Sequence, residues 1–308
     1  MYNYNLTSGG KMKLKVITLL TSAVLTGSLH AEETYSIEAG FGFMHEKSDS
    51  PSTFKDKFLG GAYYFKPVAI KDSQPFTELE FLQRSSNATF TYSNMDVEID
   101  GIEPTKLKPV SLGGTFYLDD FVLSVGYSNT SSTRLTYSSS KQSWDYKSTT
   151  PSFGVGYFVL PTTLVSISNS QNVVSYASVA GSTSIKDSTT TKTGLTAHTV
   201  MPLSGTDSIV GEIYLQKISY DDGTKTQNNN DFGIDVKYFP AMNYYVGGGF
   251  VNNSGDRAST KGTTFKLAAG YQFTPRLGLL FETSKFKVSD DAQKTSSTSS
   301  QLEVVYRF

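Results

Sequence analysis

The last ten residues, SSQLEVVYRF (299–308), contain the pattern that decides the fold. Apolar side chains recur at every second position, and the positions between them are polar except for Val305. Because successive side chains of a β-strand point to opposite faces, the alternation predicts a strand with one apolar and one polar face. Most soluble domains end instead in a loosely ordered polar tail. The apolar face consists of Leu302, Val304, Tyr306 and Phe308.

The same period of two recurs along the chain. It is clear in SIVGEIYLQ (208–216), NDFGIDVKYF (230–239) and TTFKLAAGYQF (263–273). No segment of comparable length keeps an apolar rhythm of 3.6 residues, which a helix would need. The chain has 19 Tyr and 20 Phe, and aromatic residues of this kind favour strands. The sequence therefore predicts an all-β protein.

The connections between these segments alternate in length. LPTT (160–163) and FTPR (273–276) are short, whereas YDDGTKTQNNND (from 220) and SDDAQKTSSTSS (from 289) are long and polar. Transmembrane barrels have tight turns on one rim and long loops on the other. We therefore expect a transmembrane antiparallel up-and-down β-barrel of about 14 strands, with 12 or 16 also compatible. A soluble sandwich, which also alternates apolar and polar faces, is the alternative.

A closed barrel explains the apolar chain end. In hydrocarbon, an unpaired strand edge costs several kcal/mol for each exposed polar group. The final strand should therefore pair with the first, near residues 35–43. The expected strands are 34–45, 56–66, 75–93, 105–118, 120–132, 146–160, 162–175, 188–201, 207–220, 229–240, 243–253, 261–273, 276–288 and 297–308.

The N-terminal segment has the layout of a secretory signal peptide. Met12 is followed by Lys13 and Lys15, an apolar run from 16 to 25, and small residues up to Ala31. The apolar run is too short to anchor the chain in a bilayer. We expect cleavage at Ala31, which divides the chain into an upstream extension plus signal (1–31) and a single barrel domain (32–308).

Charged residues on the polar faces are expected to line the lumen. A Lys or Arg that faces lipid at mid-membrane costs roughly 2–4 kcal/mol, whereas a water-filled lumen solvates it. These residues include both acidic and basic side chains. No loop has a sequence pattern strong enough to identify it as a constriction of the pore. The candidate pore-lining charges are Glu78, Glu80, Arg84, Glu212, Asp235, Lys237, Lys266, Glu282, Glu303 and Arg307.

The sequence contains no arrangement of residues typical of catalysis. It has no Cys and three His, of which His30 belongs to the signal and His198 is expected to point into the lumen. The stretch HEKSD (45–49) is not a HExxH zinc site, because position 49 is Asp. We therefore predict no catalytic residue, no metal, no cofactor and no enzymatic activity.

Two motifs resemble known proteins. The C-terminal strand is similar to the ending of Gram-negative outer-membrane proteins, and that resemblance implies that the barrel-assembly machinery reads Leu302, Val304, Tyr306 and Phe308. GGAYYFKPV (60–68) followed by PFTELEFLQRSSNATFTYS (75–93) resembles the first hairpins of the putative general bacterial porin family. This second resemblance implies a diffusion pore and carries over no substrate.

The expected function is a passive aqueous channel for small hydrophilic solutes and ions. The alternatives are a non-conducting structural or adhesive barrel, and a transporter of hydrophobic solutes. The stretch TYSIEAGFGF (34–43) begins the first strand directly, which leaves no room for the N-terminal hatch of such transporters.

The expected location is the Gram-negative outer membrane, reached by export through the periplasm. The expected partners are outer-membrane lipid and lipopolysaccharide, the barrel-assembly machinery and small solutes. A net charge of −1 without a basic stripe excludes nucleic acid. A monomer and a trimer are both compatible with the sequence.

Overall fold

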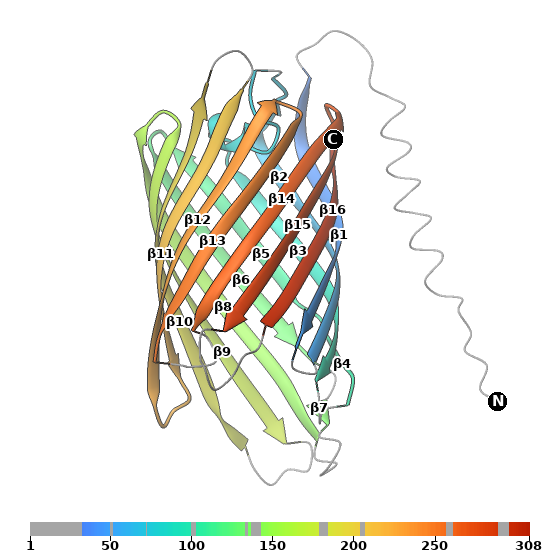
Figure 1. Cartoon of the computed structure of the whole chain (residues 1–308), viewed down its shortest axis with the longest axis vertical. Helices are drawn as coiled ribbons and strands as arrows, with labels where there is room; N and C mark the ends of the chain where they lie inside the picture. The colour runs from blue at the N-terminus through green and yellow to red at the C-terminus, as the bar shows by residue number, and fades with distance from the viewer. Residues whose placement is uncertain are drawn as a thin grey trace, which may run out of the picture.

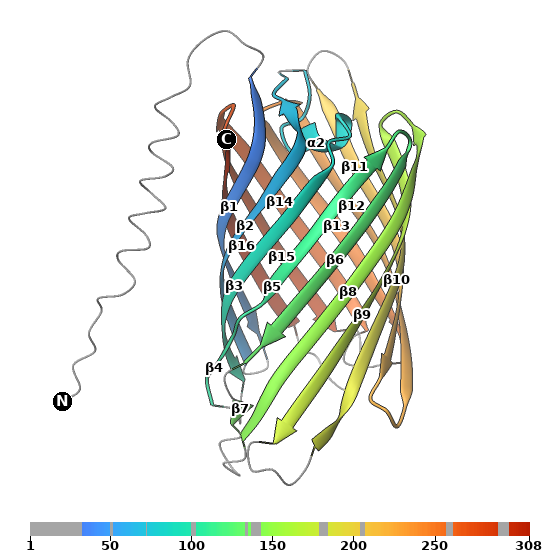
Figure 2. The same ribbon diagram turned by 180° about the vertical axis from the view of Figure 1, so that it is seen from behind.

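The computed structural model describes residues 33–49, 52–71, 73–99, 103–132, 135–136, 143–178, 184–203, 207–256, 261–288 and 296–308. They form a closed antiparallel β-barrel with a wall of 14 strands (Figures 1 and 2). Two further strands are very short, and they pair with β3 and β8. No helix in the described ranges is long and apolar enough to cross a membrane. The predicted signal peptide and its predicted cleavage site, Ala31, lie outside these ranges.

The chain runs around the wall in sequence order. The elements are β1 (Thr34–Ser48), β2 (Ser52–Ala69), α2 (Leu79–Leu82), β3 (Asn87–Ile99), β4 (Thr105–Leu107), β5 (Val110–Leu118), β6 (Phe121–Ser131), β7 (Leu135–Thr136), β8 (Ser143–Leu160), β9 (Thr163–Ser178), β10 (Ser184–Pro202), β11 (Ser208–Asp221), β12 (Thr226–Ala241), β13 (Tyr244–Gly255), β14 (Gly262–Thr274), β15 (Leu277–Val288) and β16 (Ser296–Arg307).

The first and last strands close the barrel, as the sequence predicted. β1 and β16 are paired without a break from Glu38↔Arg307 to Ser48↔Ser297. The terminal residue extends the ladder, because the Phe308 amide donates to the Ile37 carbonyl at 2.8 Å and the Phe308 carbonyl accepts from the Ser36 amide at 2.9 Å. The C-terminal strand is therefore hydrogen-bonded up to its last residue.

The two faces of the wall differ in chemistry. Large apolar side chains stand exposed on the outer face, among them Leu267 (66% exposed), Phe153 and Phe281. A soluble monomer rarely exposes contiguous apolar surface of this kind, whereas lipid requires an apolar outer band. Residues on the opposite parity contact one another along the inner surface of the wall, as Lys266 of β14 does with Asp235 of β12 on either side of Gly249. The alternation therefore sorts apolar residues outward and charged residues inward.

The two rims differ in the length of their connections. The rim at the top of Figures 1 and 2 carries the C-terminus, and we call it the turn rim. Its connections at 119–120, 161–162, 242–243 and 275–276 are tight turns. The opposite rim, the loop rim, carries the connections that follow β1, β3, β6, β9, β11, β13 and β15. One connection departs from this rule, because residues 70–86 at the turn rim form a long link between β2 and β3.

The predicted strand at 75–93 is wrong in its first half. The wall strand β3 begins only at Asn87, and residues 75–86 form turns and the short helix α2 inside the barrel. The predicted strand at 105–118 is divided into β4 and β5. The other expected strands lie close to the observed ones, as 207–220 does to β11.

The sorting of faces predicts how two arginine substitutions at the same height will behave. Leu267 and Thr283 are paired across β14 and β15, and Ala268 is paired with Glu282. Leu267→Arg should prevent assembly, because a lipid-facing arginine costs roughly 2–4 kcal/mol near the bilayer centre. Glu282→Arg should assemble, because lumen water solvates the new charge. The heat-dependent shift in gel mobility after refolding measures the folded fraction, and equal fractions would contradict the assignment of faces.

Candidate functional site

Residues 73–86, which we call the plug segment, fold into the lumen at the turn rim (Figure 2). The segment leaves β2 after Ala69, turns inward at Pro75, and rejoins the wall at Asn87. α2 lies within it and buries Leu79 and Phe81. The helix ends at Leu82, and two residues later Arg84, whose φ of 52° is left-handed, turns the chain back to the wall.

Apolar packing holds the plug segment against both sides of the barrel. Phe76 lies 6.1 Å from the ring of Phe239 and 6.1 Å from that of Tyr245, and Phe81 lies 5.3 Å from Phe158. On the other side Leu79 is buried with wall residues of β1 and β2. Each fully buried side chain of this size contributes roughly 1.5–3 kcal/mol. The first cluster contains Phe76, Phe81, Val122, Phe158, Val200, Val210, Phe239 and Tyr245, and the second contains Tyr35, Tyr64, Val68 and Leu79.

Hydrogen bonds fix the plug segment in position. The Phe76 amide donates to the Met242 carbonyl at 3.1 Å. The Phe76 carbonyl accepts from Arg307 Nη2 at 2.8 Å, and Arg307 Nε also donates to Glu38 Oε2 at 2.8 Å. Gln83 completes the attachment, because its side chain bonds both the amide and the carbonyl of Ala69. The segment is therefore attached to β2, β16 and the turn after β12.

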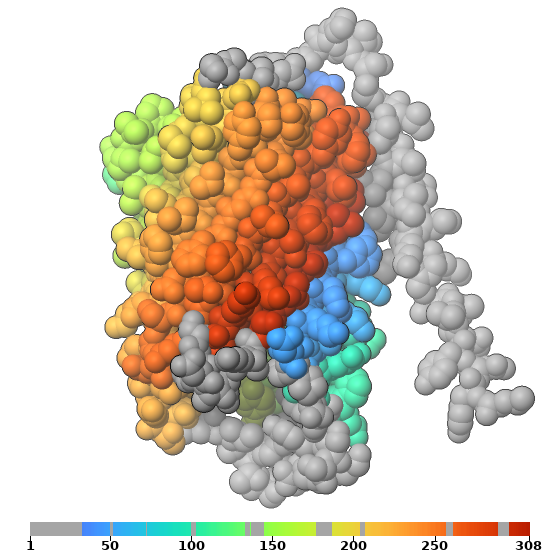
Figure 3. All heavy atoms as spheres, in the orientation of Figure 1, coloured from blue at the N-terminus to red at the C-terminus, as the bar shows by residue number. Residues whose placement is uncertain are grey.

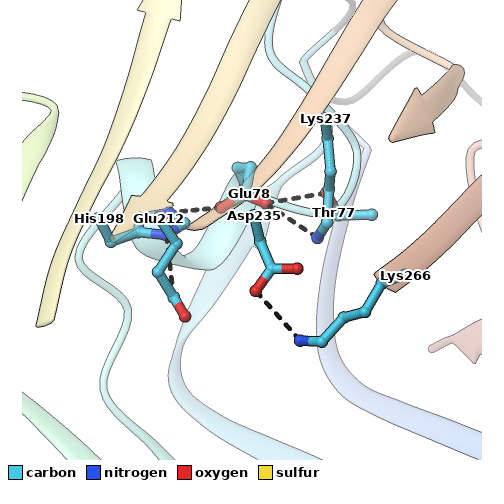
Figure 4. A network of polar contacts seen from close by, with 7 residues as sticks. All are labelled: Thr77, Glu78, His198, Glu212, Asp235, Lys237 and Lys266. Carbon is cyan, nitrogen blue, oxygen red and sulfur yellow. Dashed lines mark hydrogen bonds and ion pairs between the residues drawn. The ribbon is translucent and has the colours of Figure 1, made fainter. Parts of the chain in front are cut away.

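Figure 4 shows a charged network between the plug segment and the wall. Buried Glu78 faces His198 of β10, with Oε2 and Nε2 3.0 Å apart. The other ring nitrogen of His198 lies 3.6 Å from Glu212 Oε2 on β11. Lys237 Nζ of β12 approaches Glu78 Oε1 at 3.9 Å. Glu78 is therefore held by two cationic or ionisable side chains from the opposite wall.

The network continues along the inner wall toward the loop rim. Lys266 Nζ of β14 donates to Asp235 Oδ2 of β12 at 3.1 Å, and both side chains are about one-quarter exposed. Acidic and basic side chains therefore alternate along the interior surface of β10–β14. Within the described ranges, no group of three His, Asp or Glu residues could hold a metal ion.

The predicted pore-lining charges fall into three groups. Glu212, Asp235, Lys237 and Lys266 belong to the network of Figure 4, and Arg307 binds Glu38 and the plug. Glu282 and Glu303 lie on the inward-facing positions of β15 and β16, and among the described residues neither forms a hydrogen bond or ion pair with the plug segment. Glu78, Glu80 and Arg84 were expected on a wall strand, and that placement is wrong because all three belong to the plug segment.

Arg84 has a different role from the one that its predicted strand position implied. Its Nη1 donates to Asp120 Oδ1 at 2.8 Å and to the Asp119 carbonyl at 2.8 Å, at the turn between β5 and β6. Its guanidinium also lies 4.2 Å from the centre of the Phe158 ring. The sequence placed Arg84 toward the loop rim, but it fastens the plug to the turn rim. Sequence reasoning also missed the role of Phe76 and Phe81 in attaching the plug segment.

Glu80 is an acidic residue of the plug segment with one carboxyl oxygen that makes no hydrogen bond among the described residues. Its Oε2 is shielded from solvent and has no hydrogen-bond partner among the described residues. Burial, and after it the nearby Glu38 carboxylate, raises the pKa of Glu80 to about 8. The raised pKa favours the protonated carboxyl group at neutral pH, and this form is less costly to hold inside the plug.

The four residues expected to carry the assembly signal lie at the closing strand. Leu302 and Val304 are exposed on the outer face. Tyr306 is buried, and its ring lies 4.7 Å from that of Phe308. Their reading by an assembly machinery stays a prediction.

These features define a class of protein, a transmembrane β-barrel with a charged lumen and an inward connection at one rim. The sequence model of the family described as "Putative general bacterial porin" matches residues 11–303. The chain therefore belongs to this family of porins, and it is a channel-type barrel of the Gram-negative outer membrane.

Two solved structures are similar to this chain. The outer membrane protein Omp33 of Acinetobacter baumannii has 19% sequence identity and a TM-score of 0.55, over 90% of this chain and 100% of that one. The toluene transporter TbuX of Ralstonia pickettii has 9% identity and a TM-score of 0.53, over 89% and 90% of the two chains. At these identities the likeness concerns the fold alone. A comparison with curated proteins found no match.

The environment of Glu80 makes the attachment of the plug depend on pH. A carboxyl whose pKa is raised in the folded state stabilises that state at low pH, and this contribution is lost as the pH rises through about 8. Glu80→Gln keeps the neutral form at every pH. Relative to the wild type, this variant should protect the amides of residues 73–86 from hydrogen exchange equally at pH 5 and better at pH 9. An equal difference between the two proteins at both pH values would contradict the prediction.

Proposed function

We propose that this porin is a passive channel for small hydrophilic solutes and ions, and that the plug segment narrows its lumen at the turn rim. The observation that carries the proposal is the charged interior network of Glu78, His198, Glu212, Lys237 and the Asp235–Lys266 pair. Such a network needs water, and a wall with an apolar outer face leaves the lumen as the place for that water.

The mixture of acidic and basic side chains in the lumen determines the ion selectivity that we expect. Among the described residues of β10–β14, acidic and basic side chains lie side by side, so this part of the lumen presents no row of a single charge sign to a passing ion. Channels select ions through rings of like charge at their narrowest level. We therefore infer a weak preference between cations and anions.

The plug segment sets the expected size limit. A barrel of about 14 strands lies between small barrels filled by side chains and 16–18-stranded barrels with an open channel. Here the plug and its apolar clusters take part of the cross-section at the turn rim. The remaining path runs beside the plug, along its charged side, so the conductance should be small.

Loosening the plug should widen this path. Phe81→Ala removes the ring that packs on Phe158 and His198, a change that costs about 3–5 kcal/mol in a protein core. Its unitary conductance in planar lipid bilayers should be higher than that of the wild type. Phe281→Ala is the matched control, because Phe281 stands exposed on the outer face of β15 and should leave conductance unchanged. Equal conductances of the two variants would contradict a plug that limits flow.

The wild-type protein tests the channel itself. Stepwise currents from the pure refolded protein are expected, with a reversal potential near zero under a KCl gradient because neither sign dominates the lumen. If neither the wild type nor Phe81→Ala gave stepwise current, the non-conducting structural or adhesive barrel would replace the channel.

A cavity at the turn rim favours a second candidate, the transport of hydrophobic solutes. A space of about 380 Å³ lies between the plug and the turns that follow β12 and β14. Ile70, Phe76, Leu79 and Phe273 give it apolar walls, and Gln74 and Gln272 add amides. Uptake of radiolabelled toluene by cells that carry the protein tests this candidate. Toluene uptake that exceeds that of cells without the protein, together with no swelling of sugar-loaded proteoliposomes, would favour it over the aqueous channel.

We also infer that residues 1–31 direct export through the periplasm and that cleavage at Ala31 releases the barrel domain. The three-part layout of residues 12–31 supports this inference. The proposed function requires no catalysis and no cofactor.

A further inference from the structure

The outer wall carries exposed lysines at one side of the loop rim. Lys47 of β1, Lys55 and Lys57 of β2, and Lys285 and Lys287 of β15 are all exposed, and we call these five residues the basic patch. They lie on the same parity as the exposed apolar residues of their strands, such as Phe43, Leu59 and Phe281. The basic patch therefore faces the membrane side of the wall, away from the lumen.

The strand register brings the five lysines together. β15, β16, β1 and β2 are consecutive neighbours in the wall, and Figure 3 shows the red strands directly beside the blue one. Lys47 and Lys285 are both paired with Thr298 of β16, one from each side. With roughly 4.8 Å between strands, their backbones lie about 10 Å apart. Lys57 is paired with Phe43, which marks the edge of the apolar band.

Acidic residues neutralise only part of the patch. Lys55 is paired with Glu98 at 3.8 Å, and both side chains are more than half exposed. Asp49 accepts hydrogen bonds from the amide and the hydroxyl of Ser296. Its pKa is lowered, first by the Ser296 hydroxyl and further by Lys285 and Lys47. Within the described residues no ion pair is recorded for the remaining lysines of the patch, Lys47, Lys57, Lys285 and Lys287.

Among the described residues of β9–β13, the wall carries no such cluster. The outward positions just beyond the apolar band on β9, β10, β12 and β13 are amides and hydroxyls, namely Asn169, Thr193, Asn230 and Asn252. Among the described residues at this level on β9–β13, Lys217 of β11 is the exception. The basic patch of β15, β1 and β2 therefore distinguishes this side of the wall from β9–β13, and a general need for solubility does not explain that difference.

We propose that the basic patch is a binding site for a phosphorylated glycolipid of the outer leaflet, with lipid A phosphates on the lysines and acyl chains on the apolar band below. The long loops of barrels in this membrane face outward, so the patch lies at the headgroup level of that leaflet. Lysine binds phosphate as a flexible point charge, and its stem can reach along the wall. Phe43, Leu302 and Phe281 form one row on the outer face and supply the surface for the chains.

The test compares lysine pairs on two sides of the barrel. Lys47→Gln/Lys285→Gln removes the two charges that face each other across β16. Lys147→Gln/Lys217→Gln removes two exposed charges from β8 and β11 and is the control. Native mass spectrometry in detergent measures binding of diphosphoryl lipid A to the folded full-length proteins, and the heat-dependent gel shift checks that each variant is folded.

Loss of each patch lysine should weaken binding about fivefold, from a contribution of about 1 kcal/mol for each lysine near an anionic headgroup. The control pair should bind as the wild type does, and zwitterionic phosphatidylcholine should show no difference among the three proteins. Two results would overturn the proposal. One is an equal loss of lipid A binding in both double variants, and the other is binding of phosphatidylglycerol as tight as that of lipid A.

Discussion

Hydrogen bonding between the first and last strands is the interaction on which the structure depends. Hydrocarbon offers no partner to a backbone amide or carbonyl, so a wall that crosses a bilayer must satisfy every such group within itself. The unbroken register between β1 and β16, extended by Phe308, removes the two edges that an open sheet would leave. A closed wall then has only two environments, lipid outside and the lumen inside, and the alternation of each strand distributes side chains between them.

The plug segment is a consequence of that enclosed space. A barrel of this circumference has more interior volume than its inward side chains occupy, and an exposed apolar segment would be unfavourable in the water outside the turn rim. By turning inward, Phe76 and Phe81 bury their rings against the inner wall, and Glu78 meets His198 and Lys237. The same space provides apolar contacts for attachment and a charged side along which solutes can pass.

The alternation of apolar and polar residues predicted the wall strands correctly but gave the wrong structure for the plug segment, and the reason is physical. In wall strands, a Lys or Arg on the lipid face at mid-membrane costs roughly 2–4 kcal/mol, so the lipid-facing positions stay apolar and the alternation can be read directly from the sequence. In residues 75–86, Glu78 and Glu80 alternate with Leu79 and Phe81, which imitates a strand. What decides their structure is packing against the inner wall, which includes β8 and β10–β13 far away in sequence as well as β1 and β2. Pro75, which lacks an amide donor, and the unusual length of the expected strand 75–93 were the available signals.

The position of Arg307 links the end of the polypeptide to the interior of the barrel. Its guanidinium hydrogen-bonds both the carboxylate of Glu38 on the first strand and the main-chain carbonyl of Phe76 in the plug segment. A barrel that has not yet incorporated its last strand lacks these two hydrogen bonds, so its plug segment is not yet fully attached. Narrowing of the lumen by the plug segment is therefore expected late in assembly, and a chain truncated before Arg307 would lose this contact together with the last pair of the β1–β16 register.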